Sequence, residues 1–155
     1  MIKDVSIKKV DIHLDERGFF AELVKFGDET FHEILQTSYS ETKRGVIKAF
    51  HIHDYWEVWC VVKGEAQVVL HDLRPNSPTK GKTDVIYTGE SNMMVIAIPG
   101  NVAHGYKPLG AKPMGIIYHA SEAYNPNNIT IRTIPFDSPE INFDWNKIQI
   151  HENQS

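Results

Sequence analysis

Apolar and polar residues alternate over short stretches along most of the chain, and these stretches are rich in β-branched and aromatic residues. Because successive side chains of a strand point to opposite sides of a sheet, the alternation predicts strands. Glycine, proline, asparagine and serine separate the stretches, as is typical of turns between strands. The expected strands are Val5–Val10, Phe19–Lys25, Glu33–Ser40, Gly45–His53, Glu57–Lys63, Glu65–Leu73, Thr83–Tyr87, Met93–Ile98, Ala103–Pro108, Met114–Ala120 and Ile129–Ile134.

Short strands that follow one another through polar turns predict an all-β sandwich or barrel of the jelly-roll kind. Helical periodicity is weak, and a single helical turn is expected only at Asp28–Phe31. Lys63-Gly64-Glu65 predicts a tight hairpin between two strands. Without an internal repeat or linker, the 155 residues are expected to form a single domain over residues 1–155, with a barrel core over about 17–145. The tail from His151 to Ser155 is expected to fray.

Charge and composition argue against several classes of protein. The formal net charge is −4, and the basic pairs Lys8-Lys9 and Lys43-Arg44 do not form the clustered basic face that nucleic-acid binding requires. No stretch approaches the ~20 apolar residues of a membrane span, and the first residues do not resemble a signal peptide. A cytoplasmic protein that binds neither nucleic acid nor membranes is therefore expected. The single cysteine, Cys60, cannot form an internal disulfide, and its apolar surroundings predict burial.

Two histidines and a glutamate follow Gly45 at fixed offsets, in the pattern G-x5-H-x-H-x3-E-x6-G that ends at Gly64. His51 and His53 are two residues apart on an expected strand, so their side chains should share a face. Glu57 follows across a short turn, at the start of the next strand, and is expected to enter the same space. Two imidazoles and a carboxylate on one side of a barrel are ligands for a divalent transition metal.

A further histidine, His104, follows the Pro99-Gly100 turn and is brought to the site by a different strand. Together the two stretches resemble the signature motifs of metal-binding cupins, although Asn101 replaces a usual glycine and Pro108 a usual asparagine. The resemblance implies a cupin-type double-stranded β-helix that holds a divalent transition metal, and the motifs do not specify which of iron, manganese, zinc, nickel or cobalt it is. A polar core held by hydrogen bonds alone is the alternative. The implied metal ligands are His51, His53, Glu57 and His104.

A more specific resemblance extends from Asp15 to Trp145. Several blocks are similar, in order and spacing, to those of the dTDP-4-dehydrorhamnose 3,5-epimerases, cupin-fold enzymes of nucleotide-sugar biosynthesis that usually work without metal. The resemblance implies an isomerase that acts beside the ketone of a 4-keto-6-deoxy sugar nucleotide. The matching blocks are Asp15–Glu22 (DERGFFAE), Gln36–Ser40 (QTSYS), Gly45–His51 (GVIKAFH), His71–Gly81 (HDLRPNSPTKG), Ile98-Pro99, Ala103–Tyr106 (AHGY), Tyr118 and Tyr124–Pro126 (YNP).

The same resemblance implies which residues bind the substrate. Arg17 is expected to meet the diphosphate, Tyr124 to pack near the substrate, and Lys48 to stand where the family has an arginine. The nucleotide side is expected to be lined by Phe20, Glu22 and Gln36.

Two residues are implied in catalysis, His51 as the base that removes a proton beside the C4 ketone and Tyr118 as the acid that protonates the carbanion. Such a reaction requires a base within hydrogen-bond reach and a group that stabilises the enolate oxygen.

The chain departs from the family at the position of this stabilising group. The family's enolate-stabilising lysine corresponds to Glu57 here, and a family glutamine corresponds to His53. Ser38 replaces an asparagine, and the carboxylate that partners the catalytic histidine near the family's C-terminus has no evident counterpart. The exchanges at 57 and 53 remove a cation and add two ligands, so a divalent ion is expected to replace the lysine. If His51 is also a ligand, its lone pair is occupied and another group has to move the proton.

Three functions are compatible with these residues. The first is a nucleotide-sugar epimerase with a metal, and the second is a metal-dependent cupin of another class, such as a dioxygenase or a different isomerase. The third is a non-catalytic cupin that binds a sugar or a nucleotide. Because the resembling family forms dimers by exchange of N-terminal strands, and because Val5, Ile7 and Val10 alternate suitably for such a strand, a homodimer is expected.

Overall fold

The computed structural model describes residues 1–129 and 131–147, and this part of the chain forms strands and turns but no helix. Accordingly, no helix in these ranges has the length and apolar character needed to cross a membrane. The predicted fraying of His151–Ser155 lies outside the described residues. The strands are β1 (Ser6–Lys9), β2 (His13–Asp15), β3 (Gly18–Phe20), β4 (Gln36–Thr42), β5 (Lys48–Ile52), β6 (Glu57–Lys63), β7 (Glu65–Asp72), β8 (Thr83–Gly89), β9 (Met94–Ile98), β10 (Val102–Leu109), β11 (Met114–Ala120) and β12 (Arg132–Thr133).

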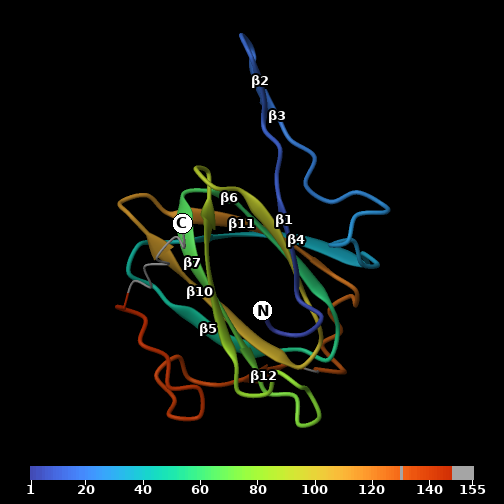
Figure 1. Cartoon of the computed structure of the whole chain (residues 1–155), viewed down its shortest axis with the longest axis vertical. Helices are drawn as coiled ribbons and strands as arrows, with labels where there is room; N and C mark the ends of the chain where they lie inside the picture. Colours follow the sequence, from blue (N-terminus) through green and yellow to red (C-terminus); the bar gives the residue numbers. More distant parts are fainter. Residues whose placement is uncertain (130, 148–155) are drawn as a thin grey trace.

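Two antiparallel five-stranded sheets form the body of the molecule. The first has the strand order β1-β9-β6-β11-β4, and the second has the order β12-β5-β10-β7-β8. Figure 1 shows them around a common interior, with the hairpin of β2 and β3 standing away from the barrel. The predicted all-β class is confirmed, and the arrangement is that of a jelly roll.

The apolar run of β6 is buried on both sides of the first sheet. Trp59 and Val61 face the interior, where they pack against residues of both sheets. Val58 and Cys60 face the outer side, which is covered by the segment that follows β3 and includes Leu23. Full burial of an aliphatic side chain contributes about 1.5–3 kcal/mol, so both sides stabilise the strand. The predicted burial of Cys60 is confirmed.

The outer side of the second sheet is covered by the C-terminal part of the described chain. Ile134, Ile141 and Trp145 pack there against Phe50 of β5, and the backbones of Phe50 and Ile134 exchange two hydrogen bonds. This cover leaves the interior between the sheets for the polar residues considered below.

Two local predictions are wrong, and one holds only in part. The expected strand Phe19–Lys25 ends at Phe20, as β3 of the β2–β3 hairpin, and residues 21–25 form no strand. The turn expected at Asp28–Phe31 is present, with the N–H of Phe31 donating to the carbonyl oxygen of Asp28 over 3.0 Å, but it is not helical. Lys63-Gly64-Glu65 does not close a hairpin, because β6 and β7 belong to different sheets. Gly64 turns the chain from one sheet to the other with a φ of 63°, and a Cβ there would lie 2.6 Å from the carbonyl oxygen of Pro113. Alternation reveals strands but not their partners.

A bulge in β5 changes which of its residues face the interior. His104 of β10 lies opposite His51, whereas Tyr106 lies opposite Lys48, so β5 has an extra residue in this interval. Gly105 makes room for it, because a Cβ there would lie 2.3 Å from the Cβ of Ala49. Residues three apart on a regular strand face opposite sides. Through the bulge, Lys48 and His51 line the same pocket.

Candidate active site

A pocket of about 320 Å³ lies between the sheets. Its walls are formed by β4, β6 and β11 of the first sheet, by β5 and β10 of the second, and by the loops that hold residues 53, 55, 122, 124 and 131. The sequence-predicted residues that line it are Gln36, Lys48, His51, His53, Glu57, His104, Tyr118 and Tyr124.

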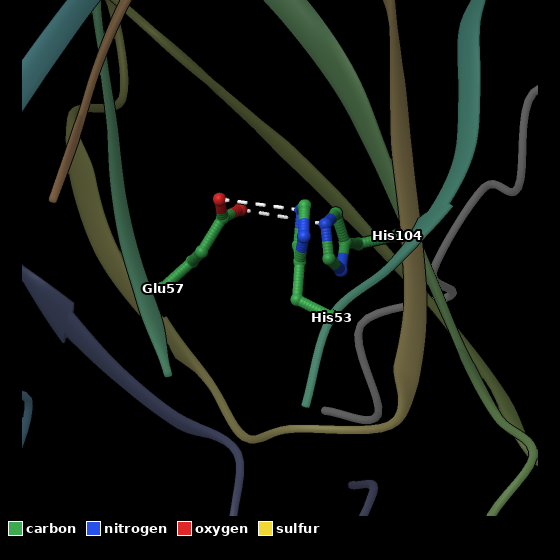
Figure 2. A group of neighbouring side chains, drawn as sticks. All are labelled: His53, Glu57 and His104. Atoms are coloured by element: carbon green, nitrogen blue, oxygen red, sulfur yellow. Dashed lines mark ion pairs between the residues drawn. The ribbon is translucent and has the colours of Figure 1, made fainter. Parts of the chain in front are cut away.

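Three predicted ligands meet in this pocket and form what we call the His–Glu–His group, His53, Glu57 and His104 (Figure 2). The two oxygens of Glu57 face different histidines, Oε1 at 3.4 Å from His53 Nε2 and Oε2 at 3.4 Å from His104 Nε2. Ligand atoms that each lie about 2.1 Å from one ion are roughly 3.0–3.4 Å apart at usual coordination angles. The ligand atoms of the buried group all lie within 4.8 Å of one another, so the group could hold a divalent ion.

Hydrogen bonds around the group direct a lone pair at Glu57. His104 Nδ1 donates to the carbonyl oxygen of Val102 over 2.9 Å, so in the neutral ring Nε2 carries the lone pair. That Nε2 is buried and has no hydrogen-bond partner in the described part of the chain. On the other side, Trp59 Nε1 donates to Glu57 Oε2 over 2.8 Å and fixes the carboxylate. A lone pair that faces a carboxylate oxygen requires a proton or a cation between them, and the donor set fits a divalent ion.

Burial works against charge on all three side chains. It raises the pKa of Glu57 to about 7, and it is the main cause that lowers the pKa of His53 to about 4 and that of His104 to about 3. Both imidazoles are therefore neutral at pH 7, as metal ligation requires. A bound cation would stabilise the ionised form of Glu57.

His51 lines the same pocket but lies outside the His–Glu–His group. Its ring centroid is 6.4 Å from that of His53 and 6.5 Å from that of His104, and the residue is exposed. Of the four residues predicted as ligands, the structure therefore brings three together. Strand alternation gives no reason for the difference, but β5 ends at Ile52 and His53 already belongs to the following loop. The lone pair of His51 stays available for proton transfer.

Tyr118 is half-buried and enters the pocket from β11, in the first sheet. His51 enters from β5, in the second sheet. The two residues implied in catalysis therefore belong to facing walls.

The substrate-binding residues predicted on the barrel also line the pocket. Lys48 Nζ donates to Ser40 Oγ over 3.2 Å, and Gln36 Oε1 accepts a hydrogen bond from the backbone N–H of Tyr124 over 2.8 Å. These contacts hold the ammonium group of Lys48 and the side-chain amide of Gln36 at the pocket wall.

Arg17, Phe20 and Glu22 do not line the pocket within this chain. Arg17 and Phe20 lie on the β2–β3 hairpin, residues 13–20, which we call the arm, and Glu22 follows it (Figure 1). Arg17 pairs with Asp15 on the arm, and Phe20 is 63% exposed. The fold thus separates the residues predicted near the N-terminus from those predicted on the barrel.

Several pocket residues were not predicted from the sequence. Two of them follow Glu57 and His104 by two positions on the same strands, so the period of two places them on the same side. Two more, Tyr55 and Glu122, lie in loops, where alternation does not specify a direction. The four that bear on the chemistry are Tyr55, Trp59, Tyr106 and Glu122.

The chain is similar over nearly its whole length to proteins of one family. The family model of dTDP-4-dehydrorhamnose 3,5-epimerase matches residues 1–154. The spore coat polysaccharide biosynthesis protein SpsL of Bacillus subtilis strain 168 is 48% identical over 147 residues, which are 94% of this chain and 97% of that protein. The probable low-salt glycan biosynthesis epimerase Agl13 of Haloferax volcanii is 33% identical over 153 residues, 97% of either protein.

Solved structures agree with this assignment. The dTDP sugar isomerase of Desulfovibrio desulfuricans G20 has the same fold, with a TM-score of 0.87 at 22% identity and with 96% of this chain and 94% of that chain covered. The epimerase RmlC of Legionella pneumophila Philadelphia 1, solved with dTDP-4-keto-L-rhamnose, has a TM-score of 0.81 at 27% identity, covering 93% and 79%. These similarities confirm the predicted cupin jelly-roll fold, and the chain belongs to the dTDP-4-dehydrorhamnose 3,5-epimerase family of enzymes.

Proposed function

We propose that the protein is an epimerase that acts beside the ketone of a 4-keto-6-deoxy sugar nucleotide, with His51 and Tyr118 as its proton-transfer residues. The observation that carries this proposal is that the two residues enter one pocket from facing sheets. Epimerisation takes a proton from one face of a carbon and returns one to the other face, which suits groups on opposite walls. The Legionella relative with its bound dTDP-4-keto-L-rhamnose supports a ligand of this class.

The surroundings of His51 suit a base. Although the residue is exposed at the pocket mouth, partial desolvation of its ring in the pocket and then the positive charge of Lys48 lower the pKa of His51, so the imidazole is neutral and accepts a proton at pH 7. On the other wall, Tyr118 supplies a phenol that can donate a proton to the carbanion. Lys48, held by Ser40, supplies a cation for an anionic part of the substrate.

We further propose that the His–Glu–His group holds a divalent transition metal in the position where the resembling family has its lysine. Support comes from the 3.4 Å spacings and from the unpartnered Nε2 of His104. Such an ion, when bound, supplies Lewis-acid stabilisation of an enolate oxygen. Trp59 holds Glu57 in orientation, and His51 remains outside the group and free to move the proton.

We also propose a homodimer in which the arm of one copy completes the pocket of the other. The arm carries exposed apolar side chains, among them Leu14 at 78% and Phe19 at 62%. β1, by contrast, pairs with β9 of its own chain and is flanked by the buried Val5 and Val10, so the arm is the better candidate for exchange. A second copy would bring the separated Arg17 to the substrate.

Deuterium wash-in from D2O tests the reaction on a panel of 4-keto-6-deoxy sugar nucleotides. We expect the wild type to exchange a proton beside the ketone, and His51→Asn and Tyr118→Phe to lose about 10²–10⁴-fold in rate. Tyr39→Phe, at an exposed tyrosine on β4 outside the pocket, is the matched control. Absence of exchange with every sugar would contradict the proposal and favour a non-catalytic binding protein.

Subunit complementation tests the shared site. If the arm serves the partner's pocket, mixed dimers of Arg17→Ala and His51→Asn contain one site without either change, and mixing the two inactive proteins restores part of the activity. Monomers in light scattering, or no gain on mixing, would contradict the exchange.

A second function is favoured by the composition of the His–Glu–His group. Two histidines and one carboxylate with open positions are also the ligand set of non-haem Fe(II) oxygenases. Oxygen consumption by the Fe(II)-loaded protein would support this function, whereas epimerisation at an unchanged rate without oxygen supports the first.

The cytoplasmic location stays a prediction.

A further inference from the structure

The members of the His–Glu–His group are held in different ways. His104 is fixed by the hydrogen bond from its Nδ1 to Val102, and Glu57 is fixed by the indole of Trp59. His53 has no such support among residues 1–129 and 131–147, because its Nδ1 is buried and has no hydrogen-bond partner there. Metal-binding histidines are usually oriented by a hydrogen bond from the second ring nitrogen. Another contact therefore has to set the direction of the His53 ring.

Tyr55 provides this contact. Its ring stacks on the ring of His53, with centroids 4.7 Å apart and planes inclined by 24°. The residue is half-buried and lines the pocket. His104 also lies nearly parallel to His53, at 5.0 Å and 27°, but it is itself a member of the group.

The loop that carries Tyr55 is fixed at both ends. The backbone N–H of Asn101 donates to the carbonyl oxygen of His53 over 2.6 Å, and a Cβ on Gly100 would lie 2.8 Å from the carbonyl carbon of Asp54. At the other end, Trp56 donates its backbone N–H to Ser121 Oγ over 3.0 Å and accepts a backbone hydrogen bond from the same residue. The loop therefore holds the Tyr55 ring in place against His53.

We infer that Tyr55 is a positioning residue, whose aromatic face holds the His53 ring in the orientation that binds an ion. This inference rests on the ion site of the proposed function. It assigns the role to the ring and not to the hydroxyl, so phenylalanine should replace tyrosine and leucine should not. Loss of the partner that orients a ligand typically lowers metal affinity by about 10–100-fold.

Titration of the metal-free full-length protein with Co²⁺, followed by visible absorption, tests the inference. We expect Tyr55→Phe to bind within about twofold of the wild type and Tyr55→Leu to bind about 10–100-fold more weakly. Tyr39→Leu, outside the pocket, is the matched control, and circular dichroism checks that each variant is folded. Wild-type affinity in Tyr55→Leu would overturn the inference. Equal weakening in Tyr55→Phe would assign the role to the hydroxyl and overturn it as well.

A second measurement does not depend on the ion. In the metal-free wild type, the ring current of the stacked tyrosine should shift the ring proton resonances of His53. The resonances should stay at these positions in Tyr55→Phe, and they should move and broaden in Tyr55→Leu. Unchanged resonances in Tyr55→Leu would refute the positioning role. Failure of the wild type to bind Co²⁺, with these resonance changes present, would instead refute the ion site and leave the role of Tyr55 in orienting His53 supported.

Discussion

Replacement of Glu57 by glutamine is expected to stabilise the metal-free protein at alkaline pH. Glu57 is 6% exposed, and burial raises its pKa from 4.5 to about 7. A raised pKa means that the folded protein keeps this proton where the unfolded chain has lost it, so the contribution of Glu57 to stability falls as the pH rises from 4.5 through 7. A difference of this size is worth roughly 3 kcal/mol above pH 7. Glutamine removes the charge and keeps an oxygen that accepts from Trp59.

The same substitution is expected to remove the response to a metal ion. At a concentration 1,000 times its Kd, an ion stabilises the folded wild type by about 4.1 kcal/mol, which exceeds the roughly 3 kcal/mol that the ionised Glu57 costs. Glutamine lacks the anionic ligand, so the variant should gain little. The order of stability at pH 8 should therefore reverse. Without metal, the glutamine variant should be the more stable protein, and with saturating Co²⁺ or Zn²⁺ the wild type should be.

Urea unfolding followed by tryptophan fluorescence measures both effects, at pH 5 and pH 8, with chelator and with added ion. His53 and His104 contribute to the pH dependence of the unfolding free energy in both proteins, so their contributions largely cancel when the variant is compared with the wild type. Glu122→Gln is the matched control, because Glu122 is an exposed carboxylate at the same pocket. If Glu57→Gln destabilises the metal-free protein equally at both values of pH, the ionised Glu57 carboxylate does not lower the stability of the wild type at alkaline pH, and the reasoning fails.

Three further predictions concern the neighbouring residues. Glu57→Lys restores the family's residue, and we expect it to abolish Co²⁺ binding and to make epimerisation insensitive to chelator; chelator-sensitive exchange in this variant would refute the replacement of lysine by an ion. Gly105→Ala places a Cβ 2.3 Å from that of Ala49, so we expect urea unfolding to show a loss of about 1–3 kcal/mol, with a higher KM because the β5 bulge is displaced. Because Lys48 lowers the pKa of His51, Lys48→Gln should move the acid limb of the kcat/KM profile to higher pH, and an unmoved limb would exclude His51 as the base.

The sequence predicts β6 and β11 with their observed bounds, because their apolar runs end at polar or turn-forming residues. The arm is not predicted, because its apolar side chains are exposed and the alternation there does not report burial against the chain's own core. For the same reason, no pattern in the sequence places Arg17 away from the pocket.

The sequence by itself determined the all-β class, the family and the set of candidate ligands, because strand period and residue spacing are local properties of the chain. Only the tertiary structure decided that His53, Glu57 and His104 meet while His51 stays apart, since this depends on the end of β5 and on its pairing with β10. The tertiary structure also brought Lys48 into the pocket, through a bulge that the missing side chain of Gly105 permits. Convergence of side chains is set by strand pairing and close backbone approach, and neither is encoded in the spacing of residues along one strand.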